Sequence, residues 1–520
     1  MTESKVTTKT DSSIEVATPS NRLLPPSGRA RTASITSTIF TKMLYHKEPK
    51  SEMKSSGAWV IGVAFIEHDA GFSKVRDVIQ RLVTKYARFR STCKMQSSHK
   101  AVFEEIDGEL DWDYHIPDLA ETTRGWTQAD VYAYLNEVGD FDYDLDKPLW
   151  RYLYIPKLVD GRAVLISCIN HAIGDGLAIV AVSEELYDPR PPATTASESP
   201  KNFKHQGKKP PQKKLDFWTK LGIFLYGLYH GATVPFSRAD PQNPLKLPKG
   251  EKPLGKKVLA LAEPISLDKV KEIKNKMEGT TINDVLMGLM TMTLKSFFIE
   301  ENRYRPGEKV TAQFPISMRG VGEGGLDMYG EPHNKVSYAY FDFNFEGSRE
   351  DIIWHTKQQI DCIKHSPSPL MINLNLQIGA RLLPYQLIMD LVSHAANLGT
   401  AQLSNVPAPQ TQMTIFNGVK VLDMNFFLFS PLACYLGILT YNGIVNAAFN
   451  LDSGLKIDPH KLAKHWNAEF ENLYREVVQK VEMNHGEPLK EPKHDTSFYQ
   501  NLAKVTVALL GLLLAYCVVL

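Results

Sequence analysis

Residues 169–180 read INHAIGDGLAIV, in which a His, an Asp four residues later and a Gly directly after it stand between two apolar runs. The preceding residues, 162–170, read RAVLISCIN and have the composition of a buried strand, so His171 is predicted to follow the end of that strand. A histidine there can act as a general base near neutral pH, because its ordinary pKa lies close to that range. Asp175 can orient the imidazole or hold the loop through an ion pair, and Gly176 can allow a turn with positive φ.

Segments typical of strands and of helices alternate on both sides of this motif. Before it, GAWVIGVAFIE (57–67) and KAVFEEI (100–106) predict strands, and FSKVRDVIQRLVTKYARFR (72–90) predicts an amphipathic helix. After it, 267–298 predicts a helix, a Thr-capped turn and a second helix starting near Ile282. Residues 436–452 predict two strands that turn at Asn442-Gly443. This order is typical of an α/β protein, here with two lobes.

A change of composition separates the two lobes. Residues 188–214 are rich in Pro, Ser and Lys, which predicts a linker, and an aromatic amphipathic helix follows at 215–236. That helix can lie flat on a membrane or pack between the lobes, and the sequence leaves both possibilities open. The predicted organisation is a disordered segment at 1–35, a first lobe with the His motif at 36–187, a basic linker with the amphipathic helix at 188–255, a second lobe at 256–482, a polar tether at 483–502 and a transmembrane tail anchor at 503–520.

The predicted anchor rests on the run VTVALLGLLLAYCVVL (505–520), which carries no charge. As a helix it would be about 24 Å long, close to the thickness of a thin bilayer core. A buried core helix is the alternative, but the polar, Pro-containing stretch before the run favours a helix tethered outside the fold. We therefore expect a membrane protein of the endoplasmic reticulum or of lipid droplets, with its lobes in the cytosol.

Composition narrows the classes of partner. The 520 residues carry 59 basic and 58 acidic side chains, so the charge balance gives no sign of nucleic-acid binding. The five cysteines are scattered without a CxxC pair, which indicates reduced thiols in the cytosol. The same spacing speaks against a zinc site and against a disulfide framework.

Six short motifs follow one another along the chain. They are PLW (148–150), INHAIGDG (169–176), TINDVLMGLM (281–290), FPISMRG (314–320), HNKVS (333–337) and LSNVPAPQ (403–410). In order and spacing they resemble the motifs of the wax ester synthase/diacylglycerol acyltransferase family. Each motif is a weak signal alone, but together they span about residues 145–455 and argue against a chance match.

The resemblance implies a fold like that of the CoA-dependent acyltransferases of the chloramphenicol acetyltransferase type, with two α/β lobes around a tunnel. It implies that His171 meets an acyl-CoA from one side and an acyl acceptor from the other. His171 would take the proton of the acceptor hydroxyl as the oxygen attacks the thioester. Acyl-CoA is then a co-substrate, and no metal, cofactor or covalent enzyme intermediate is required.

The other motif residues receive supporting roles from the same resemblance. Asp175 would hold the loop, with Arg319 as its partner, and the alternative for Arg319 is a surface arginine. Asn283 would lie near His171 and donate to the developing oxyanion, or else cap its helix with Asp284 in the first turn. Further residues are expected to line the tunnel or to support it: Pro148, Trp150, Arg319, Asn334, Asn405 and Pro407.

Three positions depart from the family pattern. Asn170 stands where the family has its first His, and His333 and Ala408 stand where it has Gly. His171 is the second His, which is the base in related acyltransferases, so activity is expected to survive. The added β-carbons are tolerable where φ stays negative.

We therefore expect a membrane-associated O-acyltransferase that moves a fatty acyl group from acyl-CoA to a long-chain alcohol, to diacylglycerol or to both. The products would be wax ester and triacylglycerol. A sterol or a smaller alcohol as acceptor is one alternative, and an inactive, membrane-tethered lipid-binding relative is another. A condensation domain of peptide synthesis shares the type of His motif, but no carrier domain accompanies it here.

Overall fold

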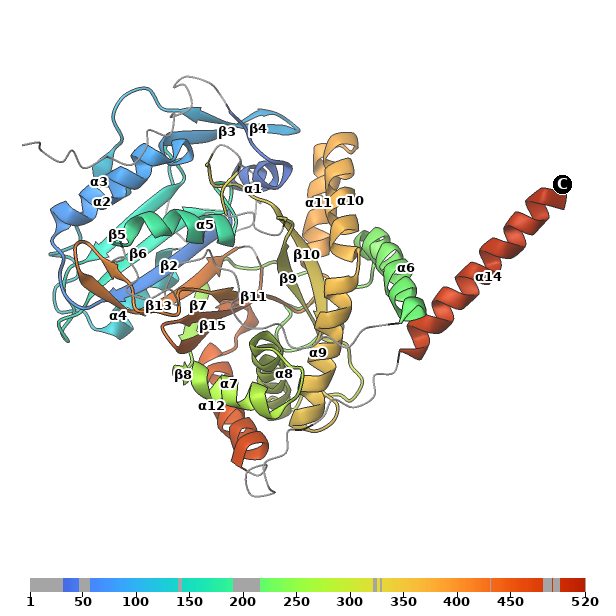
Figure 1. Ribbon diagram of the computed structural model, residues 1–520. Helices are drawn as coiled ribbons and strands as arrows, with labels where there is room; N and C mark the ends of the chain where they lie inside the picture. The colour runs from blue at the N-terminus through green and yellow to red at the C-terminus, as the bar shows by residue number, and fades with distance from the viewer. Residues whose placement is uncertain are drawn as a thin grey trace, which may run out of the picture.

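The computed structural model describes residues 31–45, 57–138, 143–189, 216–320, 325–327, 330–430, 432–479, 489 and 496–519. In these ranges the chain forms two lobes, each built around a β-sheet with helices on its outer faces (Figure 1). Two separate clusters of buried apolar side chains form the cores, one for each lobe. The prediction of a two-lobed α/β protein is therefore confirmed.

The first-lobe sheet runs in the order β12-β13-β2-β6-β5. Its strands are β12 (Thr414–Ile415), β13 (Val419–Phe429), β2 (Trp59–Ile66), β6 (Ala163–Asn170) and β5 (Trp150–Ile155). β13 pairs antiparallel with β2, with Phe429 opposite Trp59. The predicted division at 255/256 is therefore wrong for β12 and β13, because the second half of the chain supplies two strands of the first sheet. By pairing with β2, β13 covers a strand edge that would otherwise stay open.

The second-lobe sheet runs in the order β10-β9-β11-β14-β15-β7, with β8 also paired to β15. Its strands are β10 (Val336–Asp342), β9 (Thr311–Ser317), β11 (Ala401–Pro407), β14 (Cys434–Tyr441), β15 (Ile444–Asp452), β7 (Lys257–Leu261) and β8 (Ile265–Ser266). β14 and β15 form the hairpin predicted at Asn442-Gly443, where both turn residues have positive φ.

A third, small sheet shows that the chain is ordered from Arg31. Its strands are β1 (Arg31–Thr32), β4 (Lys100–Glu105) and β3 (Ser91–Ser97). Helix α1 (Ile35–Tyr45) follows β1 and begins where the hydroxyl of Ser34 accepts the N–H of Ser37. The predicted disorder of 1–35 is therefore wrong for 31–35, and the rest of that segment lies outside the described residues.

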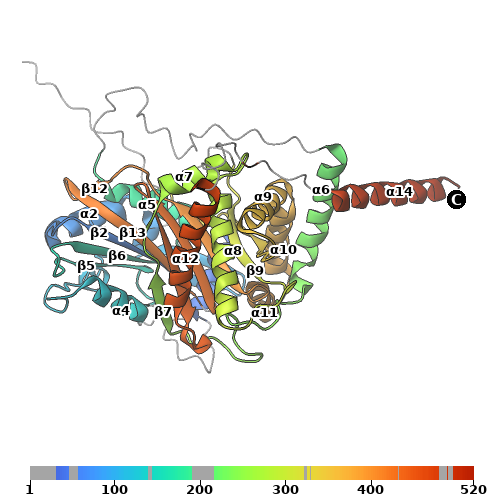
Figure 2. The same ribbon diagram turned by 90° about the horizontal axis from the view of Figure 1, so that it is seen from below.

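Helices cover the outer faces of both sheets (Figure 2). The first lobe carries α2 (Phe72–Lys85), α3 (Trp112–His115), α4 (Gln128–Val138) and α5 (Gly176–Ser183). The second lobe carries α7 (Leu267–Lys276), α8 (Ile282–Glu300), α9 (Arg349–His365), α10 (Ser368–Leu382), α11 (Tyr385–Ala396) and α12 (Pro459–Tyr474). Among the described residues, only α8 is long and apolar enough to cross a membrane, and 72% of its most apolar stretch is buried, as in a core helix.

The helix predicted at 215–236 forms as α6 (Phe217–Thr233), and it packs on the outside of the second lobe. Two glycines allow this contact, because a β-carbon at Gly227 would collide with Ser366 and Pro367, and one at Gly231 with Met371. The possibility that this helix packs between the lobes is therefore wrong. The predicted linker before it lies mostly outside the described residues.

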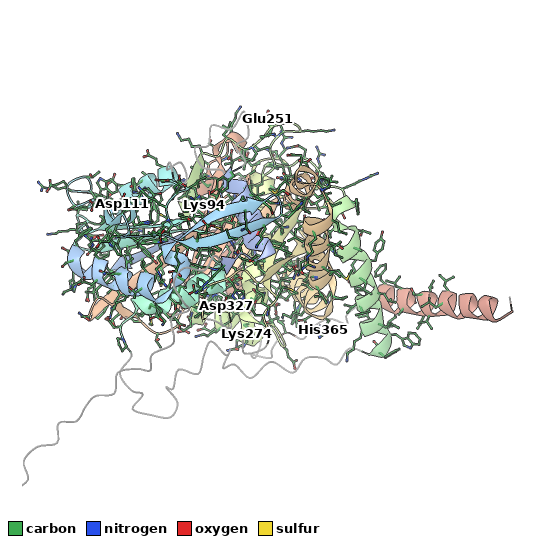
Figure 3. The ribbon with its side chains drawn as sticks, turned by 90° about the horizontal axis from the view of Figure 1, so that it is seen from above. Lys94, Asp111, Glu251, Lys274, Asp327 and His365 are labelled. Carbon is green, nitrogen blue, oxygen red and sulfur yellow. The ribbon has the colours of Figure 1, made fainter. Side chains whose placement is uncertain are left out.

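The C-terminal helix α14 (Ser497–Val519) begins inside the predicted polar tether, six residues before the predicted anchor. Its base packs on α6, where Gly222 leaves room for the backbone of Tyr499 and the ring of Tyr226 contacts those of Phe498 and Tyr499. The rest of α14 projects away from the two lobes (Figures 1 and 2). Figure 3 shows that its labelled charged side chains lie over the body and not on this projection: Lys94, Asp111, Glu251, Lys274, Asp327 and His365. The structure gives no support for a membrane-spanning role, so the anchor stays a prediction.

Candidate active site

A cavity of about 720 Å³ extends through both lobes and includes His171 in its wall. Its first-lobe arm runs along one face of the sheet, past residues of β2, β6, β5 and β13 and beneath α5. Its second-lobe arm runs over β9, β10 and β11 and beneath α10 and α11. The lining of the cavity as a whole is mainly apolar, so the cavity suits long hydrocarbon chains better than polar substrates.

His171 directly follows β6, as the sequence predicted, and the fold holds its ring from two sides. The backbone N–H of His171 donates to the carbonyl of Ala58, which fixes the chain just beyond the strand end. The imidazole stacks on the ring of Phe40 from α1, with 4.3 Å between the ring centroids. Nδ1 lies 3.1 Å from Oδ1 of Asn334, which belongs to the second lobe.

Asn334 determines which imidazole nitrogen carries the proton. Its Nδ2 donates to the carbonyl of His171 at 2.7 Å and to the hydroxyl of Ser37 at 2.9 Å, so its Oδ1 is left to face the ring. An amide oxygen only accepts, so Nδ1 of His171 must donate its proton to it. Nε2 is then the unprotonated nitrogen, available as a base.

The electrostatic surroundings keep this imidazole neutral. Burial lowers the pKa of His171 below its ordinary value, because an imidazolium loses hydration there, and nearby Asp175 acts in the opposite direction. A lowered pKa means that Nε2 is unprotonated near neutral pH. The site therefore presents a base and not an acid.

Asp175 forms the ion pair with Arg319 that the sequence suggested. The guanidinium Nη1 donates to Oδ2 of Asp175 at 2.8 Å, and the side chains are only 3% and 6% exposed. The same carboxylate accepts the N–H of Ala178, which caps α5, and the N–H of Lys335 from the second lobe. Asp175 thus ties the two lobes together beside His171.

Gly176 does not make the turn with positive φ that the sequence suggested. It is the first residue of α5 and is absent from the described residues with positive φ. It lines the cavity, and a β-carbon there would meet only open space. Neither its backbone conformation nor its surroundings therefore require a glycine at this position.

Asn170 is fully buried and is not part of the cavity wall. Its Oδ1 accepts the N–H of Ala172 at 2.9 Å, which shapes the turn after β6. The residue that replaces the first His of the motif therefore supports the backbone. At the other two departures, His333 and Ala408, φ is not positive, so their β-carbons cause no strain.

Asn283 is also not among the residues that line the cavity, although it contacts one that does. Its Oδ1 accepts from Nδ2 of Asn405 at 3.0 Å, and Asn405 does line the cavity. The cap of α8 is Thr281, in a reciprocal pair with Asp284, so Asn283 is not the cap, and its contact with a developing oxyanion stays a prediction. Of the pair Asn283 and Asn405, only Asn405 lines the cavity.

Some of the remaining predicted residues line the cavity, and the others support the fold around it. Arg319, Asn405 and Pro407 line the cavity. Trp150 is fully buried in the first-lobe core, where its Nε1 donates to the carbonyl of Phe89, and Pro148 precedes its strand. Asn334 supports the site through His171 without entering the wall.

Sequence reasoning missed three residues of the site. Ser37 and Phe40 lie in α1, whose Ser34 cap and apolar residues were a usable signal. Tyr338 of β10, which carries a phenolic hydroxyl, lines the cavity. Burial raises the pKa of Tyr338 to about 12, so that hydroxyl stays a donor. Among the described residues, no three His, Cys, Asp or Glu side chains are grouped to hold a metal ion.

Two family models match this chain. The wax ester synthase/diacylglycerol acyltransferase catalytic domain matches residues 42–286, and the C-terminal domain of the same family matches 333–474. The chain belongs to the wax ester synthase/diacylglycerol acyltransferase family. It is an acyltransferase of that family, and the motifs from which the sequence predicted it lie within or between the two matched regions.

Relatives and solved structures agree with this assignment. Wax ester synthase/diacylglycerol acyltransferases 5 and 6 of Arabidopsis thaliana are both 22% identical to the chain, covering 68% and 69% of it and 76% and 77% of their own lengths. The Marinobacter aquaeolei enzyme of this family has a similar fold, with a TM-score of 0.56, 16% identity and coverage of 86% of this chain and 99% of that one. A starter condensation domain of rhizomide synthetase, solved with C8-CoA, has a TM-score of 0.56, 11% identity and coverage of 86% and 94%.

Proposed function

We propose that this protein transfers a fatty acyl group from acyl-CoA to the hydroxyl of a long-chain alcohol or of diacylglycerol, with His171 as the general base. The observation that carries the proposal is the imidazole of His171, held with Nδ1–H on Asn334 and Nε2 available in a long apolar cavity. Without a base, an alcohol is a poor nucleophile at neutral pH.

In the proposed reaction, Nε2 of His171 takes the hydroxyl proton while the alcohol oxygen attacks the thioester carbonyl carbon. The C–O bond forms, the C–S bond breaks, and the departing thiolate takes the proton back from the imidazolium. The products are an ester and free CoA, and His171 returns to its neutral form. Asp175 and Arg319 stay outside the proton transfer, because each is engaged in the contact between the lobes.

The choice of substrates is supported by cavity chemistry and by relatives. The mainly apolar lining suits a fatty acyl chain and a lipid acceptor. The related Arabidopsis proteins are named as wax ester synthases and diacylglycerol acyltransferases, and the similar condensation domain was solved with C8-CoA. Both acceptor classes expose a hydroxyl at the end of a hydrocarbon body, so one site can serve either.

To test this function, membranes from a host without neutral lipids, expressing the full chain, would receive labelled palmitoyl-CoA and one acceptor. Hexadecanol, diacylglycerol and a sterol would be compared, and the neutral lipids separated. We expect wax ester, triacylglycerol or both. Sterol ester alone would indicate the sterol alternative, and the absence of every ester would indicate an inactive lipid-binding relative.

We further propose that residues 503–520 anchor the protein in the membrane of the endoplasmic reticulum or in a lipid droplet, with the lobes in the cytosol. Support comes from the uncharged run 505–520 in the sequence. Carbonate extraction of membranes tests the anchor. Full-length protein that stays with the membranes agrees with it, and protein that is released contradicts it.

A further inference from the structure

Few residues of the α10–α11 hairpin are fully buried, although its sequence is mainly apolar. The two helices have 15 and 12 residues, and the buried side chains among those described are only Ser368, Pro369, Gly379 and Ile388. The described helices α8 and α12 of the same lobe bury most of one face or more. An apolar helix pair left half-exposed is therefore unusual in this fold.

The exposed apolar side chains of α10 form a stripe. Leu370, Leu374, Ile378 and Leu382 follow one another at intervals of four residues and are 58%, 44%, 46% and 76% exposed. Residues four apart lie on one face of a helix, so the stripe is about 18 Å long. Leu387 of α11, 44% exposed, adds to it. We call these five residues the α10–α11 stripe.

The opposite side of the same hairpin lines the cavity. Ile372 and Leu376 of α10 and Val392 of α11 are part of the wall of the second-lobe arm. The exposed residues Gln386 and Asp390 of α11 also belong to that wall, so the arm reaches the surface at the hairpin. A molecule entering here would pass directly from the surface beside the stripe to the arm that leads to His171.

The surroundings of the stripe indicate what covers it. From 367 to 396 the chain carries only two formally charged residues, Arg381 and Asp390. α6, α10, α11 and α14 lie on the same side of the molecule in both views (Figures 1 and 2). On that side α6 exposes Phe217, Phe224 and Tyr229. A surface of this composition, next to a C-terminal helix whose single formally charged residue is Lys504, fits the apolar layer of a lipid bilayer.

We infer that the α10–α11 hairpin is a lipid portal, inserted into the bilayer by the stripe, through which a membrane-dissolved acceptor enters the second-lobe arm. The inference rests on the proposed function and adds the route by which the acceptor arrives. The acceptor then never crosses water, and its hydroxyl travels along the arm to Nε2 of His171.

A pair of acceptors separates the portal from the chemistry. The full chain and its Leu374→Glu, Ile378→Glu double variant would be assayed with diacylglycerol in phosphatidylcholine vesicles and with a short, water-soluble alcohol. The double variant loses two half-exposed aliphatic side chains that would contact the bilayer. We therefore expect KM for diacylglycerol in vesicles to rise about 10-fold or more. We expect kcat and KM for the soluble alcohol to stay unchanged. Val159→Glu and Ile299→Glu, at apolar positions 65% and 51% exposed elsewhere, are the matched controls.

An unchanged KM in the double variant, or an equal rise in the control variants, would overturn the portal while leaving the acyltransferase intact. If the wild type forms a dimer and the double variant does not, the stripe binds a second copy of the chain, and this result would also overturn the portal. Lack of activity of the wild type with both acceptors and also with hexadecanol would contradict the proposed function instead. In that case Ile378→Trp tests the portal alone: its added fluorescence should be quenched by vesicles of brominated lipid, whereas that of Val159→Trp should not. Equal quenching at both positions would refute the portal.

Discussion

The pKa of His171 has a direct kinetic consequence. Burial lowers this pKa from the ordinary 6.5, and a base must be neutral to accept a proton. The rate therefore falls as the pH drops through the lowered pKa, and we expect the acid limb of kcat/KM to have its midpoint below pH 6.5. Initial rates with a non-ionising alcohol between about pH 4.5 and about pH 8 would locate the midpoint. A midpoint above pH 6.5 would contradict the burial of a neutral imidazole.

Asn334 is a positioning residue, and a single substitution distinguishes this role from a structural one. In Asn334→Asp, a carboxylate beside Nδ1 stabilises the imidazolium, so the pKa of His171 rises and the acid limb should move to higher pH. In Asn334→Ala, the tautomer is no longer fixed, and we expect kcat to fall by at least about 10-fold with little change in KM. Equal acid limbs in Asn334→Asp and the wild type would show that Asn334 only supports the fold.

For individual residues, the sequence predicts the side chains that carry out chemistry better than the side chains that orient them. His171 stands out because a polar residue interrupts an apolar pattern, and the pairing of Asp175 with Arg319 was suggested by their motifs. The contact of Asn334 with His171 joins residues 163 positions apart, and no local pattern contains that information. The contact of Asn283 with Asn405 joins residues 122 positions apart, so it could not be predicted for the same reason.

Strand β2 carries a feature that predicts chain-length selectivity. Gly62 lines the first-lobe arm opposite Ser167 of β6, and a β-carbon at Gly62 would lie 2.7 Å from the Ser167 hydroxyl. Ser167 lies four residues before His171, which is about 13 Å along a strand. C–C bonds of about 1.5 Å advance an extended hydrocarbon chain by roughly 1.3 Å per carbon. Counted from the reacting end beside His171, Gly62 therefore lies at about the tenth carbon of a bound chain.

The double variant Gly62→Val, Ser167→Ala would fill this part of the arm without the clash. We expect the preferred length of whichever chain occupies the arm, acyl or alkyl, to shorten to about ten carbons or fewer. Competition among acyl-CoAs and among alcohols of different length would measure it, with Ser167→Ala alone as the control. Unchanged length preference for both substrates would mean that no chain occupies this arm.

Helices and strands were predicted correctly where the sequence pattern that identifies them lies within the element itself. The amphipathic helix α2, the capped helix α8 and the hairpin at Asn442-Gly443 were each predicted from residues within the element. β13 was assigned to the wrong lobe, because alternating apolar residues suit any half-buried strand and do not identify the partner. α6 was recognised, but its glycine contacts with the second lobe depend on segments far along the chain.

The ion pair between Asp175 and Arg319 joins the two lobes, and its loss should weaken the whole molecule. Removing one partner leaves a buried, uncompensated charge, so Asp175→Asn is expected to lower the free energy of unfolding by about 3 kcal/mol. The double variant Asp175→Asn, Arg319→Met removes that charge and should be less destabilised than the sum of the single variants. Denaturant unfolding of the full chain measures both. Additive losses would show that the pair does not couple the lobes.

The proposed mechanism depends on His171, the second position of the His motif, acting as the base. The most direct measurement compares acyl transfer from labelled palmitoyl-CoA by the full-length wild type, His171→Ala and Asn170→Ser, using the acceptor that the wild type prefers. We predict that His171→Ala loses activity by about 100-fold or more, whereas Asn170→Ser, which keeps an oxygen for the turn, retains most of it. Comparable activity of His171→Ala and the wild type, at equal amounts of folded protein, would contradict the account.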